Sequence, residues 1–282
     1  MSITAGTRIA GVIGSPVTHS LSPALHNAAF GQLGLDWVYL AFDVAAGRTG
    51  AALEAMRVLG LAGLSVTMPH KESMVRLVDG LDPTAAKLRS VNTVVRDGDG
   101  LLVGHSTDGD GFLASLAAAR VVVAGKAVCV LGAGGAARAI CEAVARAGAA
   151  RVAVVNRSAP AAELAAAIAI AAGSPFGVVG TAADIADADV VINATSVGMG
   201  SAELPCDAAL LHADQVVVDI VYQPRVTELL RVAKAAGAAV VDGLGMLVHQ
   251  AALQQLLWHG AQPDTAVMAA AAERELAARR QP

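Results

Sequence analysis

Residues 127–148, AVCVLGAGGAARAICEAVARAG, constrain the fold of this chain more than any other stretch. An apolar run, a glycine-rich turn and a long alanine-rich segment follow one another, an order that predicts a strand, a tight turn and a helix. Gly132 would permit the turn, Gly134 would let a ligand's pyrophosphate approach, and Ala137 occupies the third position of the usual G-x-G-x-x-G. The first N–H groups of the helix would hold the phosphates. The stretch indicates a dinucleotide site; the alternative is a glycine-rich α/β turn without a ligand.

The end of the next expected strand, at residues 150–158, indicates which dinucleotide binds. An NAD site normally has Asp or Glu about 20 residues further on, where it holds the ribose 2′-hydroxyl. This chain has Asn156, Arg157 and Ser158 there, so no carboxylate would repel a 2′-phosphate. The guanidinium can pair with that phosphate and its neighbours can donate hydrogen bonds. The sequence favours NADP; the alternative is that Arg157 is a solvated loop residue.

Strand-like runs alternate with alanine-rich helical stretches from end to end, which predicts layered α/β structure. Three late runs lack polar alternation, as strands buried on both faces of a parallel sheet do. The stretch at 247–263 predicts an amphipathic helix with no strand after it, so we expect it to complete the first domain. Strands are expected at 8–14, 37–44, 63–68, 150–158, 188–195, 215–221 and 238–244, a hairpin at 92–106, and helices at 23–33, 47–59 and 70–79.

Composition argues against several classes of protein. The chain has 20 basic and 24 acidic residues and a net charge of −4, with no basic stripe, so nucleic acid and anionic membranes are not expected partners. Its three cysteines never form C-x-x-C, and its histidines show no metal spacing, so no metal is expected. No secretory leader and no apolar run of roughly 18 residues is visible. We expect a soluble, cytoplasmic protein, monomeric or homodimeric.

Lys71 is one of only four lysines in the chain. It follows the strand-like SVTM and Pro69 in the stretch SVTMPHK, residues 65–71. Exposed lysine is the common case. From this stretch alone, Lys71 is either a solvated charge past a strand end or a working amine.

Several motifs in one order decide between these readings, because together they resemble the shikimate dehydrogenase family. The family implies a substrate domain, here residues 1–108 completed by 244–282, and a Rossmann domain for NADP, here 109–243, with a cleft between them. It implies reversible reduction of 3-dehydroshikimate to shikimate, in chorismate and aromatic amino-acid biosynthesis. The motifs are GSPVTHSLSPALHN (14–27), SVTMPHK (65–71), SVNT (90–93), GHSTDGDG (104–111), GAGGAA (132–137), NRS (156–158), NATSVGM (193–199), DIVYQP (219–224) and DGLGMLVHQA (242–251).

The resemblance implies a role for each matching polar residue of the substrate domain. Ser20 and Ser22 match the pair that binds the substrate carboxylate. Because Pro23 suits the first turn of a helix, we also expect Ser22 to be the N-cap. The residues that match the hydroxyl-binding and pocket-lining positions are Thr67, Asn92, Gln250 and Tyr222.

Lys71 and Asp108 match the catalytic pair of the family. Hydride delivery to a ketone makes an alkoxide, which a neighbouring lysine can protonate and stabilise. An aspartate beside that lysine can orient it and help to move the proton. The resemblance therefore favours the working amine for Lys71.

The cofactor positions implied by the resemblance lie in the second half of the chain. Met246 would pack beside the nicotinamide. The complete set is Gly132, Ala133, Gly134, Gly135, Ala136, Asn156, Arg157, Ser158, Thr195, Ile220, Gly243 and Met246.

Three departures from the family pattern keep alternatives open. Ser65 and Ser106 stand where the family more often has Asn, which leaves quinate or an amino analogue of shikimate as alternative substrates. The residues after Arg157, SAPAAE, lack a second basic residue, so some use of NAD is expected. A methylenetetrahydrofolate dehydrogenase on the same plan is a further alternative, which HSLSP and STDGDG disfavour. A non-catalytic sensor of shikimate-like metabolites is another, which Lys71 and Asp108 disfavour.

Overall fold

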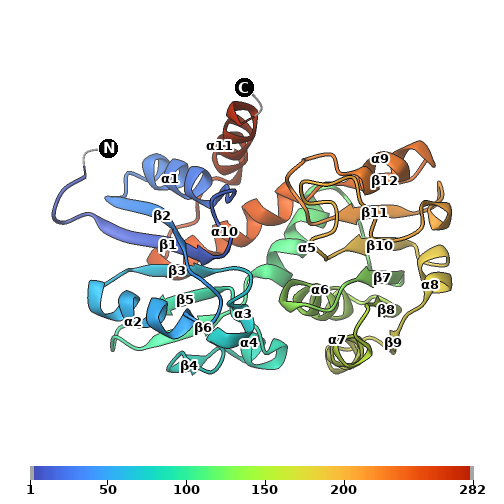
Figure 1. The fold of residues 1–282 in the computed structure, drawn as a ribbon, viewed down its shortest axis with the longest axis horizontal. Coiled ribbons are helices and arrows are strands. Elements are labelled where there is room, and N and C mark those ends of the chain that lie inside the picture. The colour runs from blue at the N-terminus through green and yellow to red at the C-terminus, as the bar shows by residue number, and fades with distance from the viewer. Residues whose placement is uncertain (1–2, 280–282) are drawn as a thin grey trace. The chain divides into compact units, whose positions relative to one another are not determined.

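The computed structural model describes residues 3–279 and divides into two compact units. The first unit holds the chain up to Thr107 and again from Val248 onward, and the second is Asp108–Leu247. Each unit is built of one six-stranded sheet with helices on it, coloured blue to cyan with the red C-terminal helices in the first unit and green to orange in the second (Figure 1). The predicted α/β class is therefore confirmed.

The first unit contains a mixed sheet. In spatial order its strands are β2 (Trp37–Asp43), β1 (Arg8–Gly14), β3 (Gly63–Val66), β5 (Thr93–Arg96), β6 (Leu102–His105) and β4 (Gly80–Leu81). Strand β1 is parallel to β2 and β3, whereas β5 is antiparallel to both β3 and β6, as the hairpin at 92–106 predicts. Its helices are α1 (Ser22–Gln32), α2 (Thr49–Leu59), α3 (Lys71–Met74), α4 (Pro83–Leu88) and α11 (Thr265–Ala278).

The second unit contains a fully parallel sheet. In spatial order its strands are β12 (Ala239–Val241), β11 (Val216–Asp219), β10 (Val190–Asn193), β7 (Ala127–Leu131), β8 (Arg151–Val155) and β9 (Phe176–Val179). The chain starts at β7 in the middle, builds outward to β9, and then returns to build β10 to β12 on the other side. Ligands of such doubly wound sheets bind where the strand order reverses, here between β7 and β10. The helices are α5 (Asp108–Ala118), α6 (Gly135–Arg146), α7 (Ala159–Ala171), α8 (Ala182–Ala186), the 3₁₀ turn η1 (Ala208–Leu210) and α9 (Glu228–Ala235).

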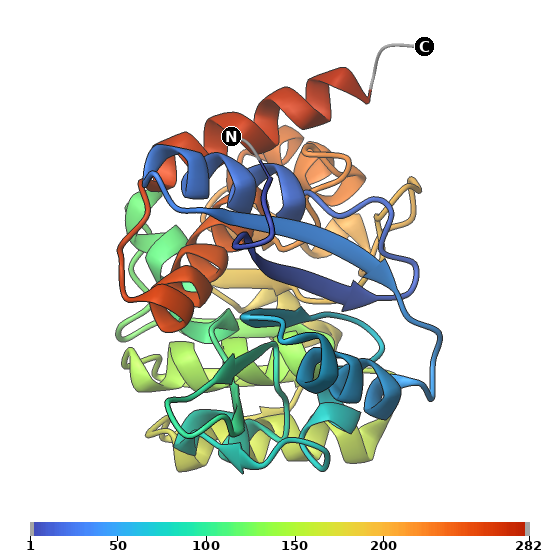
Figure 2. The same ribbon diagram turned by 90° about the vertical axis from the view of Figure 1, so that its left-hand side faces the viewer.

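Helix α10 (Leu244–His259) leads the chain back from the second unit into the first, where its C-terminal part packs on the sheet. Trp258 donates its indole N–H to the carbonyl of Val94 on β5 at 3.1 Å. A Cβ at Gly63 on β3 would lie 2.4 Å from the same indole, so glycine makes room for it. Helix α11 then lies alongside α1 (Figure 2). Val248, Ala251, Ala252 and Trp258 of the stretch at 247–263 are therefore buried within the first unit, whereas Leu256 and Leu257 are exposed.

The helix expected at 70–79 is wrong beyond its first turn. Helix α3 ends at Met74. Asp79 then donates its backbone N–H to the carbonyl of Leu102 at 2.9 Å and accepts the Leu102 N–H through its carboxylate at 2.8 Å. Pairing with β6 thus overrides the local helical preference and places Gly80 in β4.

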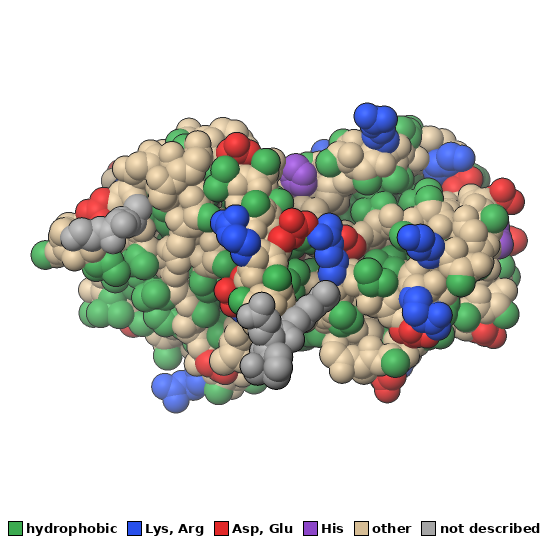
Figure 3. Space-filling model, turned by 90° about the horizontal axis from the view of Figure 1, so that it is seen from above, with side chains coloured by type: hydrophobic (Ala, Val, Ile, Leu, Met, Phe, Trp, Pro, Cys, Tyr) green, Lys and Arg blue, Asp and Glu red, His purple; other side chains and the backbone are tan. Residues whose placement is uncertain are grey.

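Charged side chains of both signs are interspersed on the face drawn in Figure 3, without a basic stripe on that face. Among residues 3–279, no helix is long and apolar enough to cross a membrane.

Candidate active site

One edge of the first sheet carries the candidate substrate residues. Strands β1 and β3 are parallel, so the segments after them, with Ser20 and Thr67, leave the sheet at the same edge. Strand β5 runs the opposite way, and its first residue, Thr93, pairs with Ser65 and His105. Asn92, before β5, therefore reaches that edge too.

The serine loop, residues 19–22, departs from the prediction in one respect. Helix α1 begins at Ser22 itself and Leu21 is its N-cap, without a side-chain cap hydrogen bond. The expectation that Ser22 is the N-cap is therefore wrong. The physical reason is that the hydroxyl of Ser20 accepts the Ser22 N–H at 3.2 Å and so already serves this helix end.

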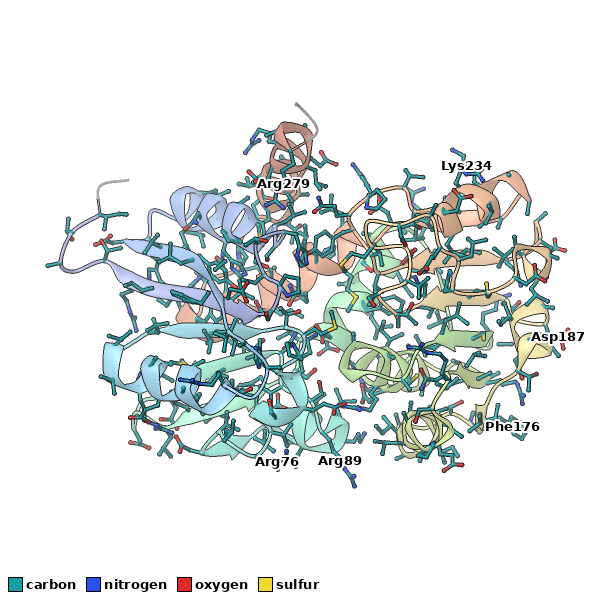
Figure 4. The ribbon with its side chains drawn as sticks, in the orientation of Figure 1. Arg76, Arg89, Phe176, Asp187, Lys234 and Arg279 are labelled. Carbon is teal, nitrogen blue, oxygen red and sulfur yellow. The ribbon has the colours of Figure 1, made fainter. Side chains whose placement is uncertain are left out.

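Arg279, at the end of α11, reaches this loop. Its guanidinium donates to the carbonyl oxygens of His19 at 2.6 Å and Ser20 at 3.1 Å. Figure 4 labels Arg279 on the C-terminal helix. The last helix of the chain thus holds the loop that carries the two predicted carboxylate-binding serines.

Buried polar groups connect the predicted substrate residues to one another. Asn92 donates through Nδ2 to the Thr107 hydroxyl at 2.9 Å and, at 3.4 Å, to Oε1 of Gln250. Gln250 Oε1 also accepts from Nε2 of Gln254 at 2.9 Å, one turn further along α10. The predicted pair Asn92 and Gln250 therefore comes together within the first unit.

Tyr39 and Gln254 belong to this cluster, and the sequence analysis missed both. Tyr39 donates its hydroxyl to Ser65 at 2.6 Å, and Ser65 donates to Oε1 of Gln254 at 2.6 Å. Burial raises the pKa of Tyr39, and hydrogen bonds with Ser65 and Ser22 only partly offset it, so the phenol stays protonated. The four-residue spacing of Gln250 and Gln254 was the signal in the sequence, because it puts both amides on one helix face.

The two predicted catalytic residues begin two different helices. Lys71 is half-buried and opens α3, and its carbonyl accepts the Val91 N–H at 3.0 Å. Asp108 is buried, directly follows Thr107 in the chain, and opens α5 in the second unit.

The glycine turn of the second unit has room for a phosphate. Gly132 has φ of +108°, and a Cβ there would lie 3.0 Å from the Thr195 methyl, so glycine is required by the fold. Gly134 is different: it is exposed at the N-cap of α6, and a Cβ there would meet nothing within 4 Å. Packing within the unit therefore gives no reason for glycine at 134, whereas close approach of a pyrophosphate does.

The other predicted cofactor residues follow the carboxyl ends of neighbouring strands. The Gly132 N–H bonds to the carbonyl of Val155 at 2.8 Å, which sets the start of the glycine turn beside Asn156, just after β8. Arg157 and Ser158 are exposed at the start of α7. Gly132, Asn156, Thr195 and Ile220 thus follow β7, β8, β10 and β11, at one edge of the parallel sheet.

A buried polar cluster fixes two of those loops. The Thr195 hydroxyl and N–H both donate to Oδ1 of Asn193, at 2.7 and 3.1 Å. Asn193 in turn donates to Asp219 at 2.9 Å, and Asp219 also accepts from Thr227 at 2.7 Å and from the Val221 N–H at 3.0 Å. Burial, the largest effect, raises the pKa of the Asp219 carboxyl.

The other predicted site residues of the second unit differ in burial and in the space around them. A Cβ at Gly243 would lie 2.3 Å from the carbonyl oxygen of Ile220, so no larger residue fits. Met246 is buried in the main apolar cluster of this unit, whereas Tyr222 is half-buried. Ala133 is buried, and Gly135 and Ala136 form the first turn of α6. Within the described part of the chain, no three His, Cys, Asp or Glu side chains gather in a way that could hold a metal.

Family models match the chain along most of its length. The shikimate dehydrogenase substrate binding domain matches residues 12–94, shikimate / quinate 5-dehydrogenase matches residues 115–242, and the shikimate 5′-dehydrogenase C-terminal domain matches residues 243–273. The chain belongs to the shikimate dehydrogenase family. The resemblance inferred from the ordered motifs is confirmed.

Individual relatives agree with this membership. The shikimate dehydrogenase (NADP(+)) of Moorella thermoacetica is 43% identical over 277 residues, which cover 95% of this chain and 93% of that protein. The crystal structure of shikimate 5-dehydrogenase from Thermus thermophilus in complex with NADP(H) and shikimate has a TM-score of 0.86 and 37% identity, covering 95% of this chain and 99% of that one. The quinate dehydrogenase of Corynebacterium glutamicum in complex with NAD has a TM-score of 0.85 and 33% identity, covering 94% and 98%.

Proposed function

We propose that this protein is an NADP-dependent shikimate dehydrogenase that catalyses the reversible reduction of 3-dehydroshikimate to shikimate, a step of chorismate and aromatic amino-acid biosynthesis. The observation that carries the proposal is the polar edge of the first sheet, where hydroxyls, the Asn92 amide and a lysine lie next to the ends of neighbouring strands and the Gln250 amide contacts Asn92. A hydroxylated ring acid needs these groups: hydroxyls for its carboxylate, amides for its ring hydroxyls and an ammonium for its carbonyl. The NADP(+)-dependent relative at 43% identity supports it.

In the proposed mechanism the protein binds, orients and protonates the substrate. NADPH, when bound, supplies the hydride. Lys71 donates a proton to the oxygen on which charge develops and stabilises that charge, and Asp108 orients the ammonium. Ser20 and Ser22 donate to the substrate carboxylate.

The ring hydroxyls are assigned to the other polar side chains of the substrate site. Thr67, Asn92 and Gln250 hydrogen-bond these hydroxyls, and Tyr222 lines the pocket. Their partners in the fold support the assignment for the amides, because the cluster of Gln254, Ser65 and Thr107 holds them in place.

The second unit fits a dinucleotide with a 2′-phosphate. Gly134 leaves space at the N-terminus of α6, where unpaired N–H groups attract phosphate. Arg157 pairs with the 2′-phosphate, and Asn156 and Ser158 donate to it. Thr195, Ile220, Gly243 and Met246 surround the nicotinamide half of the cofactor, and Ala133, Gly135 and Ala136 complete the glycine turn. NAD binds more weakly than NADP in this proposal, because it has no 2′-phosphate for Arg157 to pair with. Some use of NAD is still expected, because the loop after Arg157 has no second basic residue.

A second candidate is oxidation of quinate or of a related ring acid. Two observations favour it: Ser65 and Ser106 depart from the family pattern, and a quinate dehydrogenase is structurally similar. Ser106 Oγ is buried without a hydrogen-bond partner among the described residues.

One assay tests the proposal against its alternatives. NADP reduction is followed at 340 nm with shikimate, quinate or methylenetetrahydrofolate, and each is repeated with NAD. We expect the highest kcat/KM for shikimate with NADP. A higher kcat/KM for quinate would favour the second candidate, and turnover of methylenetetrahydrofolate alone would favour the folate dehydrogenase. No turnover of any of these substrates would favour a non-catalytic sensor.

Location and assembly belong to the same proposal. We place the enzyme in the cytoplasm, because its three cysteines are free and suit a reducing compartment. We expect a monomer or homodimer, which light scattering on the eluting protein distinguishes.

A further inference from the structure

A chain of hydrogen bonds runs through the buried interior of the first unit from Tyr39 to Gln250. The Tyr39 hydroxyl donates to Ser65 Oγ at 2.6 Å, and the Ser65 hydroxyl donates to Oε1 of Gln254 at 2.6 Å. Gln254 Nε2 then donates to Oε1 of Gln250 at 2.9 Å. Tyr39, Ser65 and Gln254 are buried, whereas Gln250 is half-buried at the polar edge of the sheet.

Two backbone groups fix the direction of these bonds. The Thr107 N–H, which can only donate, bonds to Oδ1 of Asn92 at 2.9 Å. The Asn92 carbonyl, which can only accept, faces Nε2 of Gln254 at 3.4 Å. The orientation of a side-chain amide follows from its hydrogen-bond partners. Here the orientations of the Asn92 and Gln254 amides are each fixed by a main-chain atom.

These two neighbours fix the orientation of the Gln250 side-chain amide. Its Oε1 accepts from Nε2 of Gln254 and, at 3.4 Å, from Nδ2 of Asn92. Rotating the amide by half a turn would bring its NH₂ group against two other NH₂ groups in a buried place, which leaves donors unsatisfied. Under the proposed function Gln250 therefore serves the ring substituent with an N–H of Nε2, which can only donate.

We infer that Ser65 and Gln254 are positioning residues that hold the Gln250 amide in this orientation, so that the ring substituent it serves must accept a hydrogen bond. A hydroxyl can accept one. An ammonium cannot, because its nitrogen has no lone pair. The site is thus selective for a hydroxylated ring acid against the analogue that carries an amine in place of that hydroxyl. The inference rests on the proposed function, which places Gln250 at a ring hydroxyl.

Ser65 is central to the chain because it both accepts and donates. The family more often has Asn there, so in this protein the link from Tyr39 to α10 depends on one hydroxyl. Because the link is buried, bulk water is excluded from replacing a lost bond without reorganisation.

The test compares kcat/KM, at saturating NADP, for shikimate and for its analogues with an amine in place of either non-reacting ring hydroxyl. For the wild type we expect a preference for shikimate of at least about 100-fold over one of the two analogues, since sites built to hydrogen-bond a hydroxyl reject misfits strongly. In Gln254→Leu that preference should fall about tenfold or more, mainly through a higher KM for shikimate.

Three further variants control the test. Ser65→Ala, a smaller change, should lower the same preference at least about threefold, and it keeps the inference testable if Gln254→Leu does not fold. Ser65→Thr keeps the hydroxyl and should stay within about twofold of the wild type. Gln255→Leu removes a neighbouring buried amide that bonds to His26 instead, so it should leave the preference unchanged.

The possible failures are distinct. A wild type that oxidises shikimate, together with a preference unchanged in both Gln254→Leu and Ser65→Ala, would overturn the inference alone. A wild type that uses both amine analogues as well as shikimate would do the same. A wild type that does not oxidise shikimate at all would overturn both the proposed function and the inference.

Discussion

At the scale of single residues, Lys71 carries the proposed chemistry. It opens a short helix directly after a strand end, half-buried rather than solvated. Its main chain is tied to Val91, next to Asn92, so its backbone is fixed beside the other candidate substrate residues. In the proposed mechanism a lysine whose backbone is fixed there donates its proton at a defined place, which a mobile surface lysine could not do.

Replacing Lys71 should therefore affect turnover far more than cofactor binding. We expect Lys71→Ala to lower kcat for shikimate at least about 100-fold, since general acid–base groups contribute roughly 10²–10⁴-fold. The Kd for NADP, measured by calorimetry, should change by less than about threefold. Lys234→Ala is the matched control: this lysine is exposed in the last turn of α9 (Figure 4) and should leave kcat unchanged.

The aspartate partner extends this prediction. If Asp108 works through Lys71, the double variant with Asp108→Ala should be much less damaged than the product of the two single effects. Asp110→Ala is its control, since Asp110 is exposed and forms an ion pair with Arg146, which is worth little at a surface. Near-normal turnover in Lys71→Ala would make Lys71 an ordinary charged side chain.

Arg157 should decide the choice between NADP and NAD. Its side chain is exposed beside the first turn of α7, where a 2′-phosphate would meet it. Loss of a charge-assisted bond costs roughly 1.5–3 kcal/mol, so Arg157→Ala should raise the Kd for NADP about tenfold or more. The Kd for NAD should hardly change, because NAD has no phosphate there. Equal losses for both dinucleotides would contradict the assignment.

At the scale of elements, the sequence predicted what local pattern and turn chemistry determine. The strand–turn–helix of β7 and α6 followed from Gly132 and the apolar run before it. The end of α3 at Met74 did not, because Asp79 bonds to Leu102, a residue 23 positions away. Strand β4 was not predicted either, because it forms by pairing with the distant strand β6.

The candidate site likewise depends on contacts between residues far apart in the sequence. The resemblance identified Asn92 and Gln250 by matching motifs, but it gave no information on what holds them. Ser65 and Gln254 are 189 positions apart, and only the fold brings them together. The N-cap of α1 was missed for a smaller reason: Ser20, two residues earlier, had taken the hydrogen bond that Ser22 was expected to make from its own side chain.

The packing of α10 on the first sheet gives a prediction about the stability of the fold. Gly63 on β3 lies against the indole of Trp258, and an added methyl would come within 2.4 Å of that ring. Because the ring is held by its bond to Val94, it cannot move aside freely. We expect Gly63→Ala to lower the free energy of unfolding by about 1–3 kcal/mol, the usual cost of overpacking, in urea titrations followed by tryptophan fluorescence.

Gly31→Ala is the matched control for Gly63→Ala. Gly31 lies within α1 without a left-handed φ, and a methyl there would meet nothing within 4 Å. Since alanine is the better helix former, this change should stabilise the protein by about 0.5–1 kcal/mol. Equal effects of the two substitutions would show that Trp258 is not wedged against Gly63.

At the scale of the whole molecule, each of the two units has its own buried core, so each can report its own unfolding. The apolar cluster around Ile140 lies in the second unit, and the cluster around Phe30 and Trp37 lies in the first. Both tryptophans of the chain, Trp37 and Trp258, belong to the first unit. Tryptophan fluorescence therefore follows the first unit alone, whereas far-UV circular dichroism follows both.

We expect the histidines of the first unit to make it sensitive to mild acid. His26 is fully buried, stacks on Tyr39 at 4.1 Å, and accepts a hydrogen bond from Gln255 through Nδ1 at 3.0 Å. Burial, the largest effect, lowers the pKa of His26 to about 3 from 6.5. Burial also lowers the pKa values of His249 and His259, which lie in the same unit.

The sign of the pH effect follows from where the proton binds. Between pH 6.5 and about 3, the unfolded chain protonates His26 and the folded one does not, so lowering the pH favours unfolding. The effect is absent above pH 6.5 and grows as the pH falls. At pH 5 it amounts to about 2 kcal/mol, since each pKa unit corresponds to about 1.4 kcal/mol. The carboxylates with lowered pKa values, such as Asp79 and Asp184, titrate only below their usual 3.8 and contribute little at pH 5.

We therefore expect the two units to respond differently when the pH is lowered from 7 to 5. The urea midpoint of the fluorescence transition should fall. The midpoint of the circular dichroism change from the second unit should not fall, because the raised pKa of Asp219 favours the folded state as the pH is lowered. His26→Phe keeps a flat ring against Tyr39 but cannot bind a proton. In this variant the fall in the fluorescence midpoint between pH 7 and pH 5 should be clearly smaller. Because Gln255 also donates to the main-chain carbonyl of His26, that contact to α10 survives the substitution. A fluorescence midpoint that falls as far in His26→Phe as in the wild type would show that another group carries the acid sensitivity.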